Sequence, residues 1–329
     1  MVSDVGAFDC SLEKFDPWLQ DGLPADYLEY PLRKRGMDHD IYAYRALPTT
    51  KPVQWPGGAR VALWSAVHVG HFPMDMPLKP FIAPGGMERP YPSFWDYTQR
   101  DYGNRIGIYR MMQAMAARGV KGTALISAAL AREYPVLMDD IAEAGWEPAC
   151  AGLDMGHIHH GGVAEADERA WVAEATALLR GRFGDALRGW HSPAHSESHR
   201  TPDLVAGAGY AWTSGWANDD MPYAFATKAG GLTAMPLSQD LSDQRMLQQQ
   251  NMATEDFCAA ILAAHAALDA EAAATGGGRI LTLAVTPWLM GQPHRIRAFA
   301  AMLDAILARG AVWSANGTEI MEAWRAQQG

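Results

Sequence analysis

The chain has 329 residues, of which 49% are hydrophobic, and a formal net charge of −10 at pH 7. This length and composition allow one large α/β domain with an extension, or two smaller domains, and a sizeable core in either case. The negative charge argues against a nucleic-acid surface. No window approaches about 18 consecutive apolar residues, so we expect no membrane span.

The N-terminal residues lack the basic and apolar regions of a secretory signal. The three cysteines, Cys10, Cys150 and Cys258, are odd in number and far apart, which fits neither a disulfide framework nor a paired zinc motif. We therefore expect a cytoplasmic protein.

Residues 1–55 are rich in Pro, Tyr, Asp and Arg and show no sustained hydrophobic period. We interpret them as an extended arm that packs on the body or on a neighbouring subunit. The predicted domain division is therefore an arm, 1–55, followed by an α/β body, 56–329.

Strands and helices are predicted to alternate through the body. Apolar β-type runs predict strands near 60–69, 122–126, 147–151, 210–215, 232–236, 280–285 and 312–313, with a further strand end at 189–198. Helices are predicted at 106–118, up to 144, at 165–182, from 201, at 254–274, at 294–309 and from 317. Strand runs that are apolar on both faces indicate a parallel α/β barrel or sheet.

The stretch 146–162, WEPACAGLDMGHIHHGG, is a candidate site because a short predicted strand runs into a loop with three histidines, His157, His159 and His160. Active sites of α/β folds lie at the carboxyl ends of parallel strands. Asp154 and these histidines offer metal ligands, but the adjacent His159 and His160 point apart in an extended segment. We expect no cofactor, and a divalent metal at His157, His159 and His160 is the alternative.

Histidines also follow other predicted strands. His68 and His71 end the first strand, and His191 lies beside Trp190 at a later strand end. If the body is a barrel, His68, His157 and His191 meet at one mouth. Histidine gives or takes a proton near neutral pH without a metal. Any one of these residues, taken alone, has a structural interpretation as a hydrogen-bonded loop or core histidine.

Further candidates have an equally plain structural interpretation. Asp219 either supports a base or forms a turn. Arg105 and Arg295 either anchor a carboxylate or form structural ion pairs. The aromatic residues Phe72, Trp190, Trp216 and Trp288 either line an apolar slot for a cyclic or aromatic small molecule or pack in the core. We assign catalytic roles to His68, His71, His157, His191 and Asp219, and substrate-binding roles to Trp190, Trp216, Trp288, Arg105, Arg295 and Phe72.

Three segments carry a family resemblance: YGNRIG at 102–107, GWHSP at 189–193 with NDDMPY at 218–223, and PWLMGQPHR at 287–295. Together they resemble the polysaccharide deacetylase (NodB-like) superfamily, and within it the allantoinase-like and cyclic-imide-hydrolase-like branch. The resemblance implies a distorted (β/α)7 barrel with the site at the strand carboxyl ends. Its N-terminal arm implies a homo-oligomer.

The resemblance also places the family's catalytic positions on this chain. The acidic residue that ends the first strand falls on Gly70, and two family histidines fall on Ala151 and Thr286. These positions commonly supply a base, a metal ligand and an acid, so the resemblance implies that the usual catalytic set is substituted.

Three functions remain open. The first is a hydrolase that cleaves a C–N bond in a cyclic or linear amide with histidine acid/base groups. The second is a metal-free lyase that breaks a C–C, C–O or C–N bond of an aromatic small molecule. The third is a non-catalytic homologue that binds a ligand.

Overall fold

A computed structural model describes residue 39 and residues 41–74 and 92–328. The chain divides into two compact units, Met1–Asp40 and Ile41–Gly329. The second unit contains the α/β body. Most of the predicted arm lies outside the described residues, and its boundary with the body at 56 stays a prediction.

One nine-stranded sheet organises this unit, in the order β6-β7-β5-β4-β3-β2-β1-β8, with β9 also pairing with β1. Only β6 runs antiparallel to its neighbour, β7, among the described strands. The strands are β1 (Val61–Val69), β2 (Gly122–Ile126), β3 (Glu147–Cys150), β4 (Gly189–Trp190), β5 (Trp212–Thr213), β6 (Tyr223–Phe225), β7 (Leu232–Ala234), β8 (Arg279–Val285) and β9 (Val312–Ser314).

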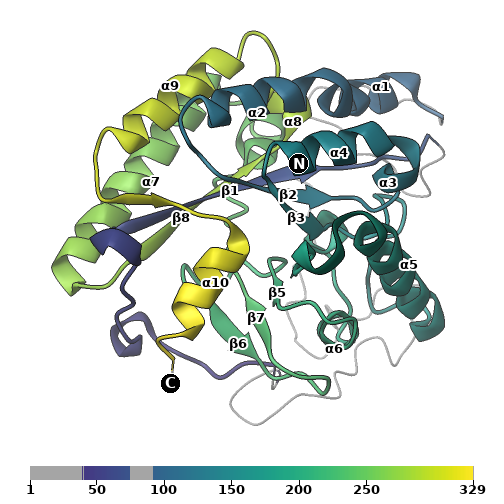
Figure 1. Ribbon diagram of the computed structural model, residues 1–329, viewed down its shortest axis with the longest axis horizontal. Helices are drawn as coiled ribbons and strands as arrows, with labels where there is room; N and C mark the ends of the chain where they lie inside the picture. Colours follow the sequence, from purple (N-terminus) through teal and green to yellow (C-terminus); the bar gives the residue numbers. More distant parts are fainter. Residues whose placement is uncertain (1–38, 40, 75–91, 329) are drawn as a thin grey trace, which may run out of the picture. The chain divides into compact units, whose positions relative to one another are not determined.

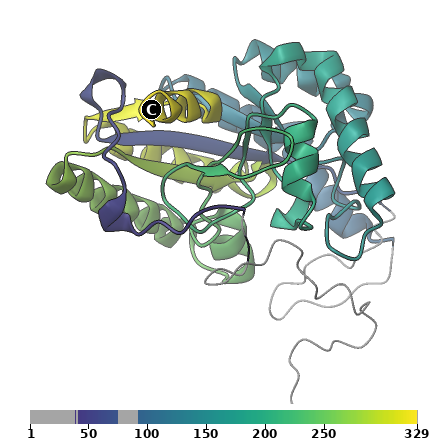
Figure 2. The same cartoon turned by 90° about the horizontal axis from the view of Figure 1, so that it is seen from below.

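Helices cover the sheet (Figure 1). They are α1 (Phe94–Tyr102), α2 (Ile108–Ala116), α3 (Leu130–Glu133), α4 (Pro135–Glu143), α5 (Glu165–Phe183), α6 (Thr201–Gly207), α7 (Thr254–Thr275), α8 (Pro287–Met290), α9 (Ile296–Leu307) and α10 (Gly317–Arg325). Helix α7 packs on β8 and α9, whereas α10 contacts β1. Figure 2 shows α10 and α7 on opposite sides of β1 and β8.

The sheet curls around an apolar interior. Alternate residues of a strand face opposite sides, and Ala62, Trp64 and Ala66 of β1 belong to one buried cluster with Leu125, Trp212 and Ala284. The indole of Trp64 donates to Thr123 Oγ1 at 2.9 Å. Between β8 and the end of β7, Thr282 Oγ1 donates to Pro236 O at 3.0 Å and bridges the open side. The predicted α/β fold of the distorted-barrel type is confirmed.

Helix α10 and a buried carboxylate close the amino-terminal end of the interior. Glu147 of β3 accepts hydrogen bonds from the backbone N–H groups of Gly317 and Thr318, at 2.8 and 2.9 Å. These N–H groups belong to the first turn of α10, where an anionic side chain is favoured. Burial raises the pKa of Glu147, and these hydrogen bonds act in the opposite sense. This acid therefore has a structural role.

The helical segment before β2 begins earlier than the predicted residue 106. Ser93 Oγ caps α1 by accepting from the Asp96 N–H at 3.3 Å. A π-helical turn, Gly103–Gly107, then leads into α2. A Cβ at Gly107 would lie 2.0 Å from Pro287 O, so only glycine permits this approach. Two of the segments that carry the family resemblance therefore touch, and their contact positions Trp288.

Helix α7 is long and apolar enough, by length and composition alone, to cross a membrane. In the structure, two acidic side chains of α7 form ion pairs with arginines at the starts of β1 and β8. Asp269 pairs with Arg60 at 2.6 Å and Glu271 with Arg279 at 3.2 Å. Its apolar face packs on β8 and α9, so α7 is accounted for as a covering helix of the sheet.

Candidate active site

A cavity of about 60 Å³ lies at the carboxyl ends of β1, β2, β3, β4 and β8. Residues at or just beyond these strand ends line the cavity. Side chains alternate between the two faces of a strand, and these residues continue the positions that face the interior. They are His68, Ser127, Ala151, His191 and Thr286. Since the share of one water in the liquid is ~30 Å³, the described cavity has room for reacting groups, and the rest of any substrate extends outward.

Three imidazoles meet at this cavity. His68 is near the end of β1, His191 follows β4, and His195 lies in the short helical turn η6 (Pro193–His195). The ring centroids are 4.9 Å apart for His68 and His191, 4.5 Å for His191 and His195, and 6.0 Å for His68 and His195. One ring nitrogen of each lies within 4.8 Å of the other two.

The backbone of η6 brings His195 to the other two histidines. Ala194 and His195 both have positive φ, 56° and 55°, which is unfavourable for residues with a side chain. Gly152, after β3, has φ +68°, and a Cβ there would lie 2.3 Å from Pro193 Cγ. The glycine thus lets the Pro193 ring pack against the neighbouring strand end, and this packing supports the strained turn.

Hydrogen bonds orient His191. Its backbone N–H donates to Cys150 O at 2.7 Å, which extends the pairing of β3 and β4. Its Nδ1 lies 3.1 Å from Ser214 Oγ. When Nδ1 donates this hydrogen bond, the lone pair of Nε2 is available to react or bind.

The three histidines are held neutral at pH 7. Burial first, and then the charge of His195, lower the pKa of His68 to about 3. Burial also lowers the pKa of His195 to about 4. The pKa of His191 lies well below its usual value, through burial first and then through His195 and His68. A positive charge on His195 thus opposes protonation of His68 and His191, and a positive charge on His68 opposes protonation of His191.

Asp243, which the sequence did not suggest, lies behind the cavity. It is fully buried, and Oδ2 accepts from Thr286 N at 2.6 Å and from Thr286 Oγ1 at 2.9 Å. Burial raises its pKa to about 7, whereas the Thr286 hydrogen bonds and the charge of Arg295 act to lower it. Its position in a polar loop between predicted elements gave no signal of burial. The next residue, Gln244, lines the cavity.

Two of the predicted substrate-binding residues line the cavity: Phe72 and Trp288. The guanidinium of Arg100 lies 4.6 Å from the Phe72 ring centroid and 5.5 Å from that of Trp288. Cation–π contact thus joins the two aromatic walls. Arg100 is a further residue that sequence reasoning missed.

The three histidines of the segment 146–162 do not line this cavity and contact other groups. His157 Nδ1 lies 2.7 Å from Asp154 Oδ1, and its ring packs on Trp171 of α5. His159 is buried with its Nδ1 3.2 Å from Glu168. His160 is exposed and accepts from Gly162 N. From this stretch Ala151 and Met155 line the cavity of His68, and none of its three histidines does.

Glu168 is the centre of a structural network beneath His159. Burial favours its neutral form, yet hydrogen bonds from His159, Thr201 and Ser198 outweigh burial and lower its pKa to about 2. Arg200 adds an ion pair at 3.2 Å. The network fixes α5 to the loop before α6.

The remaining predicted catalytic residues, His71 and Asp219, contact other parts of the body. His71 O accepts from Met155 N at 2.9 Å. Asp219 pairs with Arg45 at 3.2 Å and accepts from Met221 N at 2.9 Å, as in a side-chain-stabilised turn. Neither residue is among those that line the cavity of the three histidines.

Other predicted binding residues also lie apart from the cavity. Trp190 faces away from His191, is 0% exposed and donates to Ser192 Oγ at 2.9 Å. Trp216 donates to Glu197 at 2.7 Å. Arg295 Nη1 reaches Leu289 O at 3.5 Å, and burial lowers its pKa while Asp243 raises it.

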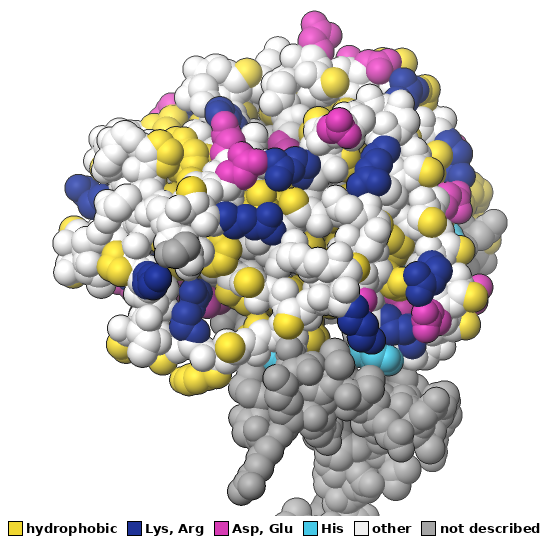
Figure 3. Space-filling model, turned by 60° about the horizontal axis from the view of Figure 1, so that its bottom comes forward, with side chains coloured by type: hydrophobic (Ala, Val, Ile, Leu, Met, Phe, Trp, Pro, Cys, Tyr) yellow, Lys and Arg dark blue, Asp and Glu magenta, His cyan; other side chains and the backbone are white. Residues whose placement is uncertain are grey.

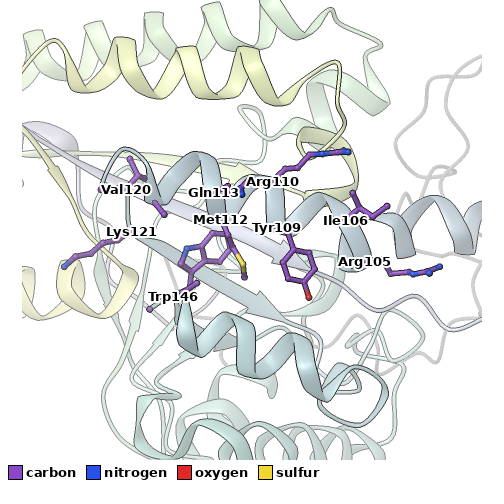
Figure 4. Close-up of a pocket in the computed structure, with 13 residues that line it drawn as sticks. Arg105, Ile106, Tyr109, Arg110, Met112, Gln113, Val120, Lys121 and Trp146 are labelled. Carbon is purple, nitrogen blue, oxygen red and sulfur yellow. The ribbon is translucent and has the colours of Figure 1, made fainter.

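Arg105 borders a different hollow, of about 760 Å³, between α2 and the turn before β3. In Figure 4, Met112 points from α2 toward Trp146, Tyr109 points toward α4, where its hydroxyl donates to Asp140 at 2.7 Å, and Arg105 points outward. This hollow lies near the amino-terminal ends of β2 and β3. Catalytic groups of barrel folds gather at the opposite ends, so we do not place the active site here.

Figure 3 shows Lys and Arg side chains interspersed with Asp and Glu over the face in view, and no single-sign patch dominates that face. The cavity of the three histidines is the best candidate for chemistry in the described part of the chain, because it brings titratable side chains from separate strand ends together.

No family model matches the chain. A curated relative named as a putative polysaccharide deacetylase of Schizosaccharomyces pombe is 24% identical, with 82% of this chain and 87% of the relative covered. The solved structure of PuuE allantoinase has a TM-score of 0.76 at 22% identity, covering 88% of this chain and 99% of that one. A probable polysaccharide deacetylase from Pseudomonas aeruginosa PAO1 has a TM-score of 0.75 at 22% identity, covering 85% and 96%. These similarities confirm the fold expected from the sequence resemblance.

Proposed function

The body of this protein has the polysaccharide deacetylase fold, and on that premise we propose that it is a hydrolase that cleaves a C–N bond in a small cyclic or linear amide. The observation that carries the proposal is the meeting of His68, His191 and His195 at one cavity. The similarity to an allantoinase and to polysaccharide deacetylases supports a hydrolase.

In the proposed reaction a water molecule held by the imidazoles attacks the amide carbon. One imidazole nitrogen accepts a proton from the water as the new C–O bond forms. The C–N bond then breaks, and the leaving nitrogen takes the proton from the imidazolium. A linear amide and water give a carboxylic acid and an amine or ammonia, which exchange a proton to become a carboxylate and an ammonium ion. A cyclic amide opens to a single product that carries the new carboxyl group and the released N–H group.

The cavity walls support a compact substrate. Phe72, Leu125 and Trp288 provide apolar surface, and Ser127 and Gln244 provide polar groups close to the histidines. A small number of polar groups on an apolar wall is typical of sites for small molecules. We therefore favour a cyclic amide over a polymer.

His191→Ala tests the proposal. Full-length protein is assayed on a panel of cyclic imides, cyclic ureides and linear amides in ¹⁸O-labelled water. We expect ¹⁸O in the carboxylate product and a fall in kcat of about 10²-fold or more in the variant, the usual contribution of a general base. The melting temperature should stay within a few degrees of wild type.

Because His191 is buried, His191→Asn provides a variant of closer size, and the exposed His160→Ala is the matched control, expected to keep wild-type turnover. Wild-type rates in a folded His191 variant would exclude that residue from the mechanism. Absence of turnover over the whole amide panel would contradict the hydrolase. Turnover of an aromatic substrate without ¹⁸O incorporation would support the lyase instead.

A further inference from the structure

We propose that His68, His191 and His195 form a binding site for a divalent transition-metal ion of the zinc type. Each residue offers one ring nitrogen, and these nitrogens lie within 4.8 Å of one another. Among the described residues, this is the one group of histidine, cysteine and acidic side chains close enough to hold an ion together. This metal site is a separate proposal from amide hydrolysis, because binding of an ion can be measured without any substrate.

The donor set favours a zinc-type ion. Three imidazole nitrogens suit Zn²⁺, Cu²⁺, Ni²⁺ or Fe²⁺, whereas Mg²⁺ and Ca²⁺ prefer oxygen. The nearby Cys150 offers no competing thiolate, because it is fully buried and burial raises its pKa to about 12. Three protein ligands are the usual number in catalytic zinc sites, which leave a fourth position open. Here the open position would face the cavity.

The surroundings of the three rings point to a built site. Ser214 lies at hydrogen-bond distance from His191 Nδ1 and leaves Nε2 to coordinate, as a supporting hydrogen bond does for metal-bound histidines. His195 Nδ1 is buried and has no hydrogen-bond partner in the part of the chain that the structure describes. The positive φ of Ala194 and His195 is the kind of strain that concentrates at functional sites.

His191 is buried, and His68 and His195 are partly buried. Neutral imidazole is the form that binds a metal. A tetrahedral zinc ion with Zn–N distances of ~2.1 Å separates its ligand nitrogens by ~3.4 Å. The imidazoles are therefore expected to draw closer around the ion by side-chain rotation.

This site differs from the locations that the sequence suggested. Gly70 and Ala151, where the resemblance places family catalytic residues, have no ligand atom, and Thr286 Oγ1 donates to Asp243. His157, His159 and His160 each contact other groups. The three imidazoles come instead from β1, the end of β4 and η6.

Metal binding to the full-length protein, purified without a histidine tag and stripped with a chelator, tests the site. Zn²⁺ is titrated by calorimetry, and Co²⁺ by its visible absorption, the intensity of which reports four-coordinate geometry. We expect one ion per chain in wild type and at least ~100-fold weaker binding in His68→Ala and His195→Ala. Ser214→Ala should weaken binding ~10–100-fold by removing the support of His191. His160→Ala is the matched control and should bind as wild type does.

Failure of wild type to bind either ion would overturn the site, and so would wild-type affinity in both His68→Ala and His195→Ala. His195→Asn, which preserves more of the side-chain volume, replaces His195→Ala if the latter unfolds. A protein that hydrolyses amides without binding metal would contradict the metal site and leave the proposed reaction standing. A protein that binds metal but hydrolyses no amide would support the metal site and contradict the proposed reaction.

Discussion

Asp243 illustrates how a single buried group can set a pH dependence. Its pKa is raised to about 7 from 3.8, chiefly by burial. A carboxyl group whose pKa is higher in the folded state favours folding in its protonated form. The free energy of unfolding should therefore fall as pH rises from about 4 to about 7, and then level off as far as this group is concerned.

Asp243→Asn should remove this contribution. Because the amide stays neutral, we expect the melting temperature of the variant to decline less than that of wild type between about pH 5 and pH 8. Melting curves at one-unit pH steps measure the difference. Asp240→Asn, an exposed neighbour, is the control. Parallel curves for wild type and Asp243→Asn would show that the carboxyl group does not titrate in this range.

At the residue scale, the sequence predicted part of the candidate site. His68 and His191 were predicted because inward-facing positions at the ends of parallel strands meet, and the structure brings their rings together. His195 was not chosen, since no sequence signal marks positive φ at Ala194 and His195. His157 was expected at the same mouth, but the chain turns away after Ala151, so its ring packs on Trp171.

Among the elements, the turn η6 depends on a contact with the neighbouring strand end. The Pro193 ring packs against Gly152 so closely that a Cβ on this residue would clash with the ring. The position of His195 therefore depends on a residue that carries no functional group. This dependence can be tested because Gly145 has a similar positive φ but no neighbouring side chain at the position of an added Cβ.

Gly152→Ala should destabilise the protein by about 2–4 kcal/mol, because left-handed backbone strain and a steric clash add. It should also weaken Co²⁺ binding by displacing His195. Gly145→Ala is the matched control: its φ is +67°, and nothing lies within 4 Å of the added Cβ. We expect the control to lose only ~1–2 kcal/mol and no metal affinity. Urea unfolding and Co²⁺ titration compare the two variants, and equal effects would contradict the contact's role.

Long elements were predicted closely, and some short ones were not. The structure has β8 at Arg279–Val285 and α5 at Glu165–Phe183, close to the expected 280–285 and 165–182. Helix α1 was missed because it exposes Phe94 and Trp95 and has no regular apolar face in sequence. Strand β6 has three residues and is antiparallel, so pairing with β7, not its own pattern, defines it.

At the scale of the whole molecule, a side-chain hydrogen bond from Thr282 links β8 to the chain just after β7. Thr282 Oγ1 donates to Pro236 O and spans the interval between β8 and the end of β7. Thr282→Val conserves volume but removes the donor. We expect a loss of about 1–3 kcal/mol in the free energy of unfolding, because a buried carbonyl is left without this partner.

Urea unfolding measures this loss, with Thr98→Val as control. Thr98 makes a comparable hydrogen bond to Phe94 O at 2.6 Å, but on an exposed helix face. Exposed substitutions usually change stability by less than ~0.5 kcal/mol. Similar losses in both variants would mean that the bond between β7 and β8 has no special weight in closing the barrel.

The pairing of β1 also has a consequence for synthesis on the ribosome. Strand β1 carries His68, yet Val61 pairs with both Arg279 and Val312. Strand β2 can pair with one edge of β1 early, but β8 and β9 are translated long after β1, so this part of its pairing stays incomplete until they have emerged. Contacts between such distant residues slow folding and prolong the exposure of aggregation-prone surface. The pairing that holds the His68 strand on its β8 and β9 side is therefore completed only after both of these strands have been made.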